Sequence, residues 1–535
     1  LLYRKDDGSL SDDMIRANFI RNSEAGGVGY HYHAPYNTFT GMCGAVLVSS
    51  FAKSSIVGFH LRGITDTPSG KALFISHTVL KNAIAKTKEW KSTFPTHVNG
   101  MFPQSRYEKT IVTSQDVHPK SPINFLPKGS NVEYLGQTSG RASYTKSDVV
   151  VTPISSLVEE ETGVSNQHGP PQFHRWKMWQ ESLQYSANPG AGVEPTLIDR
   201  AVVDYCGGLT DVLQSNEFKE MARSELKPLT NMEALCGKDG VRFIDAMKRS
   251  TSKGFPLTGP KSELVTLLDP EDYPDFACPA ECDKMIMEEF EKMENMLRSG
   301  TRCYAIFKAC VKDEPTKIGK SKVRVFQAAD WAFQMLIRKY FLPLARILSL
   351  FPLVSECAVG VNAQGPEWDD LARHMKKFGE DRILAGDYSK YDLRMPAALI
   401  LAAFKVLINV AEECGQYTED DLTIMRGIAT EVAFACVAYN GDIIIHRGSN
   451  PSGQNLTVYI NCIVNSLLLR CGYYHMYPAE NGNPEPFRKN CAAMTYGDDM
   501  KGSVRKGCDW FNHISYAKFL KERDMVFTMP DKESE

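Results

Sequence analysis

The stretch that decides the fold of this chain is residues 491–500, Cys-Ala-Ala-Met-Thr-Tyr-Gly-Asp-Asp-Met. An apolar run, Cys491 to Met494, leads into Tyr496–Asp499, and a second strand-like stretch follows from Met500 to Val504. This order predicts a tight β-hairpin with two adjacent carboxylates at its tip. Because like charges this close repel, a divalent cation such as Mg²⁺ or Mn²⁺ would stabilise the pair. A solvated Gly-Asp turn is the alternative for the stretch taken alone.

A second carboxylate pair lies upstream, in Ile-Leu-Ala-Gly-Asp-Tyr-Ser-Lys-Tyr-Asp at residues 383–392. The apolar start predicts a buried strand with Asp387 at its end and Asp392 in the following turn. Asp392 could cap a helix such as Ala397 to Glu412. Capping does not explain Asp387, because a carboxylate that ends an apolar strand should be paired or metal-bound. Carboxylates from two neighbouring strands at one point are what a two-metal phosphoryl-transfer site requires.

A third element lies between these two. Residues 448–457 begin as a loop with Gly, Asn and Pro, and an apolar-periodic helix is expected from Leu456 to Leu469. This helix carries Asn461 and Asn465, which are four residues apart and therefore share a face. Polar side chains on an apolar helix need partners, and a sugar hydroxyl is one candidate. Two asparagines satisfied within the core are the alternative.

A fourth element is basic. The chain as a whole has a formal net charge of −3, so the basic residues between positions 308 and 324 are a local enrichment. Only Asp313 and Glu314 oppose them. Such a segment suits a phosphate-binding channel or a solvated face. The basic residues are Lys308, Lys312, Lys317, Lys320, Lys322 and Arg324.

In this order the four elements resemble the motifs of the RNA-dependent RNA polymerase of picorna-like positive-strand RNA viruses. The resemblance extends from about Lys227 to the C-terminus, and Asp387–Asp392 is closer to the insect and marine-protist virus branches than to the enteroviruses. It implies an α+β right-hand polymerase with fingers and an antiparallel palm sheet with helices. The residues that carry it are Lys312-Asp313-Glu314 with Lys322–Arg324, Asp387–Asp392, Ser452-Gly453 with Thr457 and Asn461, and Tyr496–Asp499.

The resemblance also implies site roles. Two Mg²⁺ or Mn²⁺ ions would be held mainly by Asp387 and Asp498, with Asp499 assisting. A lysine near the C-terminus, Lys532, would protonate the leaving pyrophosphate, although a lysine in an acidic tail is usually a surface charge. The triphosphate would be held by Lys312 and Arg324. The ribose 2′-hydroxyl would be bound by Asp392 and Asn461, helped by Ser452 and Thr457. Gly453 would also belong to the nucleotide-binding site.

The N-terminal region resembles part of a second protein. Cys43 lies in a Gly-rich turn before an expected buried strand, and a second strand, Ser55 to Phe59, leads to His60. A lone cysteine near glycine is ordinarily a small buried hydrophobe. The pattern is nevertheless similar to the C-terminal barrel of the chymotrypsin-like cysteine protease encoded upstream of these polymerases. That resemblance implies Cys43 as nucleophile, and Thr38 and His60 as residues of the glutamine pocket. The catalytic histidine would precede Leu1, so this part is expected to be inert alone.

The two resemblances imply four regions, and length and composition agree with this division. We expect a truncated protease barrel at 1–90, a linker and polymerase start at 91–171, fingers at 172–380, and a palm without its thumb at 381–535. Gln104-Ser105 is a candidate cleavage junction. Hydrophobic residues make up 43% and charged residues 23%, as in ordinary globular proteins. The 14 scattered cysteines suit a reducing compartment, and no transmembrane segment is expected.

These features together predict RNA-templated transfer of nucleoside monophosphates to a 3′-hydroxyl. The expected partners are RNA template and primer, ribonucleoside triphosphates, a protein primer and other viral replication proteins, at membrane-associated complexes in the host cytoplasm. A reverse transcriptase is one alternative, but it should have an aromatic residue at position 392, where this chain has Asp. A non-catalytic RNA-binding segment of a polyprotein is the other alternative.

Overall fold

The computed structural model describes residues 18–21, 29–33, 46–48, 56–63, 69–74, 78, 81–82, 117–127, 130–138, 146–173, 176–190, 192–319 and 323–530. The chain divides into two compact units. The first comprises residues 1–93 and 127–130, and the second comprises residues 94–126 and 131–535.

The first unit contains a five-stranded antiparallel sheet in the order β1-β2-β5-β4-β3. His60 lies in β4, opposite Ala72 of β5. Thr38, Cys43 and the candidate junction Gln104-Ser105 lie outside the described residues. The protease barrel and its cysteine site therefore stay a prediction from the sequence. The strands are β1 (Asn18–Arg21), β2 (Gly29–His33), β3 (Val46–Val48), β4 (Ile56–Gly63) and β5 (Ser69–Phe74).

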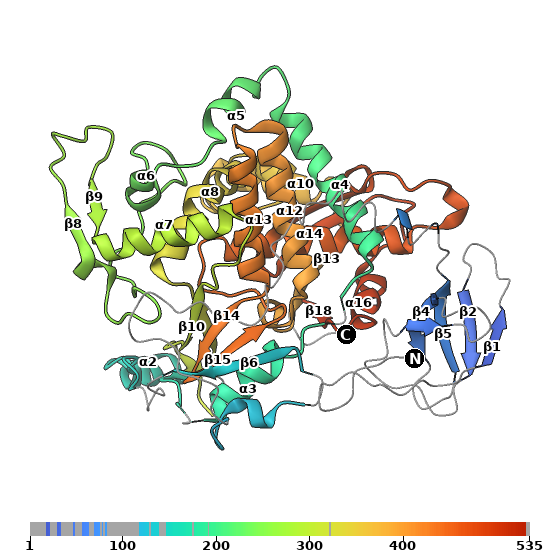
Figure 1. Ribbon diagram of the computed structural model, residues 1–535, viewed down its shortest axis with the longest axis horizontal. Coiled ribbons are helices and arrows are strands. Elements are labelled where there is room, and N and C mark those ends of the chain that lie inside the picture. Colours follow the sequence, from blue (N-terminus) through green and yellow to red (C-terminus); the bar gives the residue numbers. More distant parts are fainter. Residues whose placement is uncertain are drawn as a thin grey trace. The chain divides into compact units, whose positions relative to one another are not determined.

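The second unit is built around a four-stranded antiparallel sheet in the order β16-β17-β13-β18. Helices α10 and α14 pack against β16. Helix α16 packs against β13 and β18 (Figure 1). The strands are β13 (Ile383–Tyr388), β16 (Cys491–Tyr496), β17 (Asp499–Val504) and β18 (Phe527–Thr528). The helices are α10 (Pro366–Met375), α14 (Thr457–Met476) and α16 (His513–Lys521).

A second sheet of this unit has the order β12-β10-β14-β15-β6. Strands β10 and β14 are parallel and the other neighbours are antiparallel. Strand β6 comes from the region expected as a linker, so that part of the region belongs to a sheet. The strands are β6 (Val132–Gln137), β10 (Ile306–Val311), β12 (Val325–Ala328), β14 (Cys436–Tyr439) and β15 (Asp442–His446).

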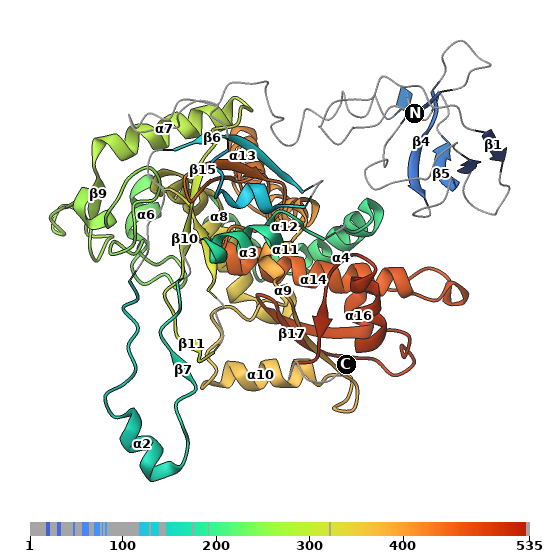
Figure 2. The ribbon, with the colours of Figure 1, turned by 90° about the horizontal axis from the view of Figure 1, so that it is seen from below.

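An arm extends from this second sheet. Its stem is the pair β7 (His168–Gly169) and β11 (Thr316–Lys317), and Figure 2 shows α2 (Ser155–Thr162) at its far end. Helix α2 buries none of its residues. The arm is anchored near its base by Asp313, which accepts hydrogen bonds from the Ser147 hydroxyl at 2.6 Å and the Asp148 N–H at 2.7 Å.

Long apolar helices form the core beside the sheets. The expected helices at 397–412 and 456–469 are confirmed as α12 and α14, with starts within one residue, although α14 continues to Met476. Helix α12 begins after Pro396, so Asp392 does not cap it. These core helices are α4 (Pro195–Leu213), α7 (Lys284–Arg298), α8 (Trp331–Leu350), α12 (Ala397–Cys414) and α13 (Glu419–Ala433).

Shorter elements complete the described part of the chain, in which no helix meets the length and apolarity that a bilayer crossing needs. They are η1 (Pro122–Phe125), α3 (Lys177–Ser186), α5 (Lys219–Glu225), α6 (Asn231–Cys236), η2 (Lys261–Leu264), β8 (Val265–Leu267), β9 (Ala280–Cys282), α9 (Pro352–Ser355), α11 (Tyr391–Arg394), η3 (Ala479–Asn481) and α15 (Phe487–Asn490).

Candidate active site

The predicted hairpin is confirmed. Strands β16 and β17 pair up to Tyr496 and Asp499, which leaves Gly497 and Asp498 as a two-residue turn. Gly497 has φ +64°, a conformation that glycine adopts without strain. Gly502 allows the two strands to approach, because a Cβ there would lie 2.3 Å from the Ala492 carbonyl oxygen. The turn therefore holds Asp498 at the tip and Asp499 at the first position of the return strand.

The second carboxylate strand is the direct neighbour of this hairpin. In the β13–β17 pair Gly386 is opposite Met500, so the next residue, Asp387, reaches the end of the sheet where the hairpin turns. On its other side Asp387 is opposite Thr528 of β18. Gly386 is required for this packing, since a Cβ at that position would lie 2.1 Å from Cζ of Phe527. The expected adjacency of the two carboxylate strands is confirmed.

The three candidate metal ligands do not form a closed cage. Within the described ranges, no three or more His, Cys, Asp or Glu side chains are grouped closely enough to hold a metal ion. Mg²⁺ typically binds through one or two carboxylates and completes its shell with waters and substrate phosphates. The carboxylates of Asp387 and Asp498, on adjacent elements at one sheet end, are oxygen donors of this kind. The donor set fits a hard cation whose remaining ligands come from solvent and a phosphate substrate.

Asp392 lies in α11, close to the same end of the sheet. The Asn461 amide of α14 donates to Asp392 Oδ1, and the Asn450 side chain donates to Asn461 Oδ1 at 2.8 Å. The backbone N–H of Asn450 also donates to the Asp392 carbonyl at 2.9 Å. A chain of hydrogen bonds thus connects the third sequence element to the second, and Asp392 and Asn461, both expected to bind a ribose hydroxyl, are hydrogen-bonded to each other.

The pKa of Asp392 is affected by the charges of two other candidate site residues, Asp498 and Arg324. The pKa of Asp392 is raised to about 6, mainly by burial; the charge of Asp498 contributes to the rise, while the Asn461 hydrogen bond and the Arg324 charge act in the opposite direction. The mutual influence of Asp392, Asp498 and Arg324 means that segments far apart in the sequence share one electrostatic environment.

The loop before α14 is hydrogen-bonded to β12 through its backbone. The Gly453 N–H donates to the Gln327 carbonyl at 2.9 Å, and a Cβ on Gly453 would lie 2.6 Å from that oxygen. The Thr457 hydroxyl donates to the carbonyls of Pro451 at 3.0 Å and Gln454 at 2.9 Å, so it holds the loop together. Ser452 is exposed. Of the helpers expected beside Asn461, Gly453 and Thr457 therefore have clear structural tasks in this loop.

Two residues of the basic element, Lys312 and Arg324, form ion pairs with the carboxylate of Glu314. Glu314 accepts from Arg324 through both its oxygens, one at 2.6 Å from Nη2, and forms an ion pair with Lys312 at 3.1 Å. The hydrogen bonds that Arg324 donates to Glu314 raise the pKa of Arg324, as do the charges of Asp392 and Asp498. The side chains of Lys312 and Arg324 remain 46% and 60% exposed. Two further basic residues, Lys320 and Lys322, and the candidate acid Lys532 lie outside the described residues.

Three residues without a specific role in the sequence motifs support the site. Asn465, expected only to share a face with Asn461, is fully buried and donates to the carbonyls of the hairpin turn. Tyr388 follows Asp387 and donates to Asn465, and Tyr516 of α16 is hydrogen-bonded to Tyr388. The four-residue spacing of the asparagines was the available signal for Asn465. No sequence signal connected Tyr516 to the site.

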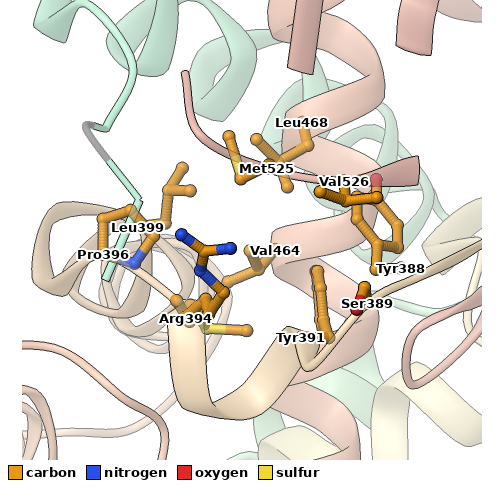
Figure 3. Close-up of a pocket in the computed structure, with 11 residues that line it drawn as sticks. Tyr388, Ser389, Tyr391, Arg394, Pro396, Leu399, Val464, Leu468, Met525 and Val526 are labelled. Atoms are coloured by element: carbon orange, nitrogen blue, oxygen red, sulfur yellow. The ribbon is translucent and has the colours of Figure 1, made fainter. Parts of the chain in front are cut away.

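A small cavity lies behind β13, lined by Tyr388, Tyr391 and Arg394, with Val464 of α14 and Met525 (Figure 3). Its volume is about 10 Å³ and its lining is mostly apolar. This is near the lower limit for a single water molecule. The cavity is too small for a nucleotide, so the candidate substrate site is the open end of the sheet at the hairpin.

Comparisons with known proteins agree with this geometry. The family described as viral RNA-dependent RNA polymerase matches residues 208–534. The chain is 24% identical to the replicase polyproteins of Drosophila C virus and of cricket paralysis virus, over 93% of its length in each case. It spans about 28% of the length of these relatives. The structure is similar to the Sicinivirus 3Dpol RNA-dependent RNA polymerase, with a TM-score of 0.57 at 17% identity, over 76% of this chain and 78% of that one.

Proposed function

This chain belongs to the viral RNA-dependent RNA polymerase family, and we propose that it catalyses RNA-templated transfer of nucleoside monophosphates to a 3′-hydroxyl, with release of pyrophosphate. The observation that carries the proposal is the pairing of β13 with the β16–β17 hairpin, which sets Asp387 beside the Gly497–Asp499 turn at one end of the sheet. The same function follows from the order of the four sequence elements.

Asp387 and Asp498 would hold two divalent metal ions, with Asp499 assisting. When bound, such ions lower the pKa of an attacking hydroxyl and stabilise the leaving oxygen. Asp498 is half-buried at the turn, and Tyr496 and Asp499 on its two sides are exposed. The task of the protein is to fix the separation of the carboxylates, since a ligand misplaced by a fraction of an ångström weakens a metal site.

Arg324 and Lys312 would bind the triphosphate. Both cations are paired with Glu314, whose negative charge reduces the repulsion between them. A triphosphate carries more negative charge than one carboxylate and accepts bidentate hydrogen bonds from arginine. We therefore propose that the incoming nucleotide takes these cations from Glu314. The influence of Asp498 on the pKa of Arg324 supports their proximity to the metal site.

Asp392 and Asn461 would select ribonucleotides. Their side chains are already hydrogen-bonded to each other, and Asn450 orients Asn461 from behind. A buried polar pair that bonds a 2′-hydroxyl discriminates against a sugar that lacks it, because the protein groups then lose a partner. A polar residue at position 392 disfavours the reverse transcriptase alternative, which requires steric exclusion of that hydroxyl. RNA template and primer, a protein primer and other viral proteins are the partners this function implies.

The N-terminal sheet supports a second, separate proposal. Five antiparallel strands that include His60 are compatible with the C-terminal half of a chymotrypsin-like cysteine protease, in which Cys43 would be the nucleophile and Thr38 and His60 would line the glutamine pocket. The polymerase proposal does not depend on it.

Primer extension on an RNA template tests the polymerase proposal. It is performed with this chain and with a longer replicase segment that contains it, in Mg²⁺. Asp498→Asn should reduce incorporation by at least about a thousandfold, because the transition state loses several kcal/mol of metal-dependent stabilisation. Asp420→Asn, which changes an exposed carboxylate on α13, is the matched control and should leave the rate unchanged. Normal incorporation by Asp498→Asn contradicts the proposed site.

In the same assay Asn461→Ala should increase deoxynucleotide use relative to ribonucleotide use.

A further inference from the structure

Asn465 lies at the centre of the site although it faces no solvent. It is fully buried on α14, and its Nδ2 is 3.2 Å from the Gly497 carbonyl oxygen, 3.1 Å from that of Asp498 and 3.4 Å from that of Asp499. These three carbonyls belong to the turn that carries the hairpin carboxylates. One amide group with two hydrogens is therefore shared among the backbone acceptors of the whole turn.

The other end of the same side chain contacts the second carboxylate strand. Asn465 Oδ1 accepts from the Tyr388 hydroxyl at 3.2 Å, and this hydroxyl is 2.6 Å from the hydroxyl of Tyr516 on α16. Tyr388 is the residue directly after Asp387. The tyrosine ring is itself fixed by packing against Tyr391 and Phe527, with ring centroids 4.6 and 4.9 Å away.

No other common side chain supplies this combination of groups at the same size. Aspartate has no hydrogen to donate to the turn, and leucine would leave three carbonyls and a hydroxyl without this partner in the interior. The orientation of the amide follows from its partners: the nitrogen faces acceptors and the oxygen faces a hydroxyl donor. Cys462, one turn earlier on α14, supports the hairpin from the same face, since its Sγ accepts from the Gly497 N–H at 3.1 Å.

We propose that Asn465 is a positioning residue that sets the separation of Asp387 from Asp498 and Asp499, and thereby the affinity of the site for divalent metal. The inference rests on the proposed function, because it assumes that these carboxylates bind the metal. It assigns to α14, beyond its contact with the sugar site through Asn461, the task of holding both carboxylate segments in register. Groups that orient metal ligands from behind typically change metal affinity about 10- to 100-fold when they are lost.

Metal binding without turnover tests this inference. Mn²⁺ is titrated into the 535-residue chain in the presence of a ribonucleoside triphosphate and absence of RNA, and free Mn²⁺ is measured by electron paramagnetic resonance. Asn465→Ala should weaken binding about 10- to 100-fold. Tyr388→Phe keeps the ring and removes only the hydroxyl, so it should weaken binding by a smaller factor in the same direction.

The matched control is Asn490→Ala. Asn490 is a buried asparagine that also contacts a tyrosine hydroxyl, Tyr473, at 2.8 Å, but its partners lie away from the hairpin turn. It should lower the melting temperature without changing Mn²⁺ affinity. Unchanged Mn²⁺ affinity in Asn465→Ala overturns the inference. If that variant does not fold, unchanged affinity in Tyr388→Phe overturns it instead. A wild-type chain that binds no Mn²⁺ under these conditions overturns the metal site itself, and the proposed function with it.

Discussion

At the scale of single residues, Asp392 illustrates how burial changes the chemistry of a carboxyl group. Its pKa rises from 3.8 to about 6 because burial disfavours the charged form and Asp498 adds a second negative charge. Asn461 and Arg324 offset part of this rise. A carboxyl group whose pKa is shifted by burial and by a specific charged neighbour is a candidate for a functional role.

This state has a consequence for stability as a function of pH. The folded-state pKa is above the unfolded value, so folding becomes less favourable as pH rises from about 4 to about 6, and the penalty is complete above that range. Asp392→Asn should remove it and raise the free energy of unfolding at pH 8 by up to about 3 kcal/mol, with little gain at pH 4. Urea denaturation at both pH values, without divalent metal, measures the difference. Asp420→Asn should show no such difference, and an equal gain for Asp392→Asn at both pH values would contradict the assignment.

At the scale of elements, the central sheet depends on glycines where side chains would collide. Gly386 in β13 is covered by the Phe527 ring, and Gly502 in β17 lies against the backbone of β16. These close contacts allow β13, β16 and β17 to pack tightly. The segment with Asp387 and the hairpin turn with Asp498 therefore lie at the same end of the sheet. The apolar character of the strands predicts that they are buried. Which residue packs against each glycine depends on the order of the strands in the sheet.

Gly386→Ala should destabilise the protein by about 1–3 kcal/mol, because the added methyl group overlaps the Phe527 ring and the sheet must shift. Gly207→Ala is the matched control. Gly207 lies inside α4, and an added Cβ would meet no atom within 4 Å beyond its chain neighbours and the backbone of its own helix, so alanine should be neutral or should stabilise by up to about 1 kcal/mol. Thermal and urea unfolding of both variants measure the effects. A stable Gly386→Ala variant would mean that Phe527 does not cover β13 in solution.

At the scale of the whole molecule, a buried ion cluster connects segments that are distant in sequence. Arg470 of α14 is fully buried and donates to both oxygens of Glu356, at 2.6 and 2.7 Å, and to Asp204 of α4 at 2.7 Å. Arg488 adds an ion pair with Glu356 at 3.3 Å. Burial alone would raise the pKa of Glu356, but the charge of Arg470 and its hydrogen bonds hold it below the ordinary value. The cluster connects α4, α14 and the segment between α9 and α10.

Arg470→Met should reduce the free energy of unfolding by about 3–5 kcal/mol, because two buried carboxylates lose their main partner. Adding Glu356→Gln to this variant should recover part of the loss, since one uncompensated charge disappears. Lys376→Met, which breaks an exposed ion pair with Glu380, should change stability by less than about 0.5 kcal/mol. Denaturant unfolding of the four proteins tests the coupling, and equal effects of the buried and exposed changes would refute it.

The sequence by itself determined the local chemistry of the site. An apolar run, a turn-forming Gly497 and two carboxylates predict a hairpin with acidic residues at its tip, because turn type and side-chain alternation are local properties. The same reasoning identified β13 with Asp387 at its end and α14 with its polar face. The order of these elements was sufficient to indicate the polymerase family, which the family match confirms.

Only the tertiary structure decided how these elements support one another. It placed Glu314 between Lys312 and Arg324 and brought β6 into a sheet from a region that looked like a linker. It also joined Asn465 to the hairpin turn directly and to the Asp387 strand through Tyr388. Each of these contacts joins side chains or strands whose approach depends on the packing of other elements. Periodicity and turn chemistry act over a few residues along the chain, whereas burial and hydrogen-bond partners in this site are set by segments tens to hundreds of residues apart.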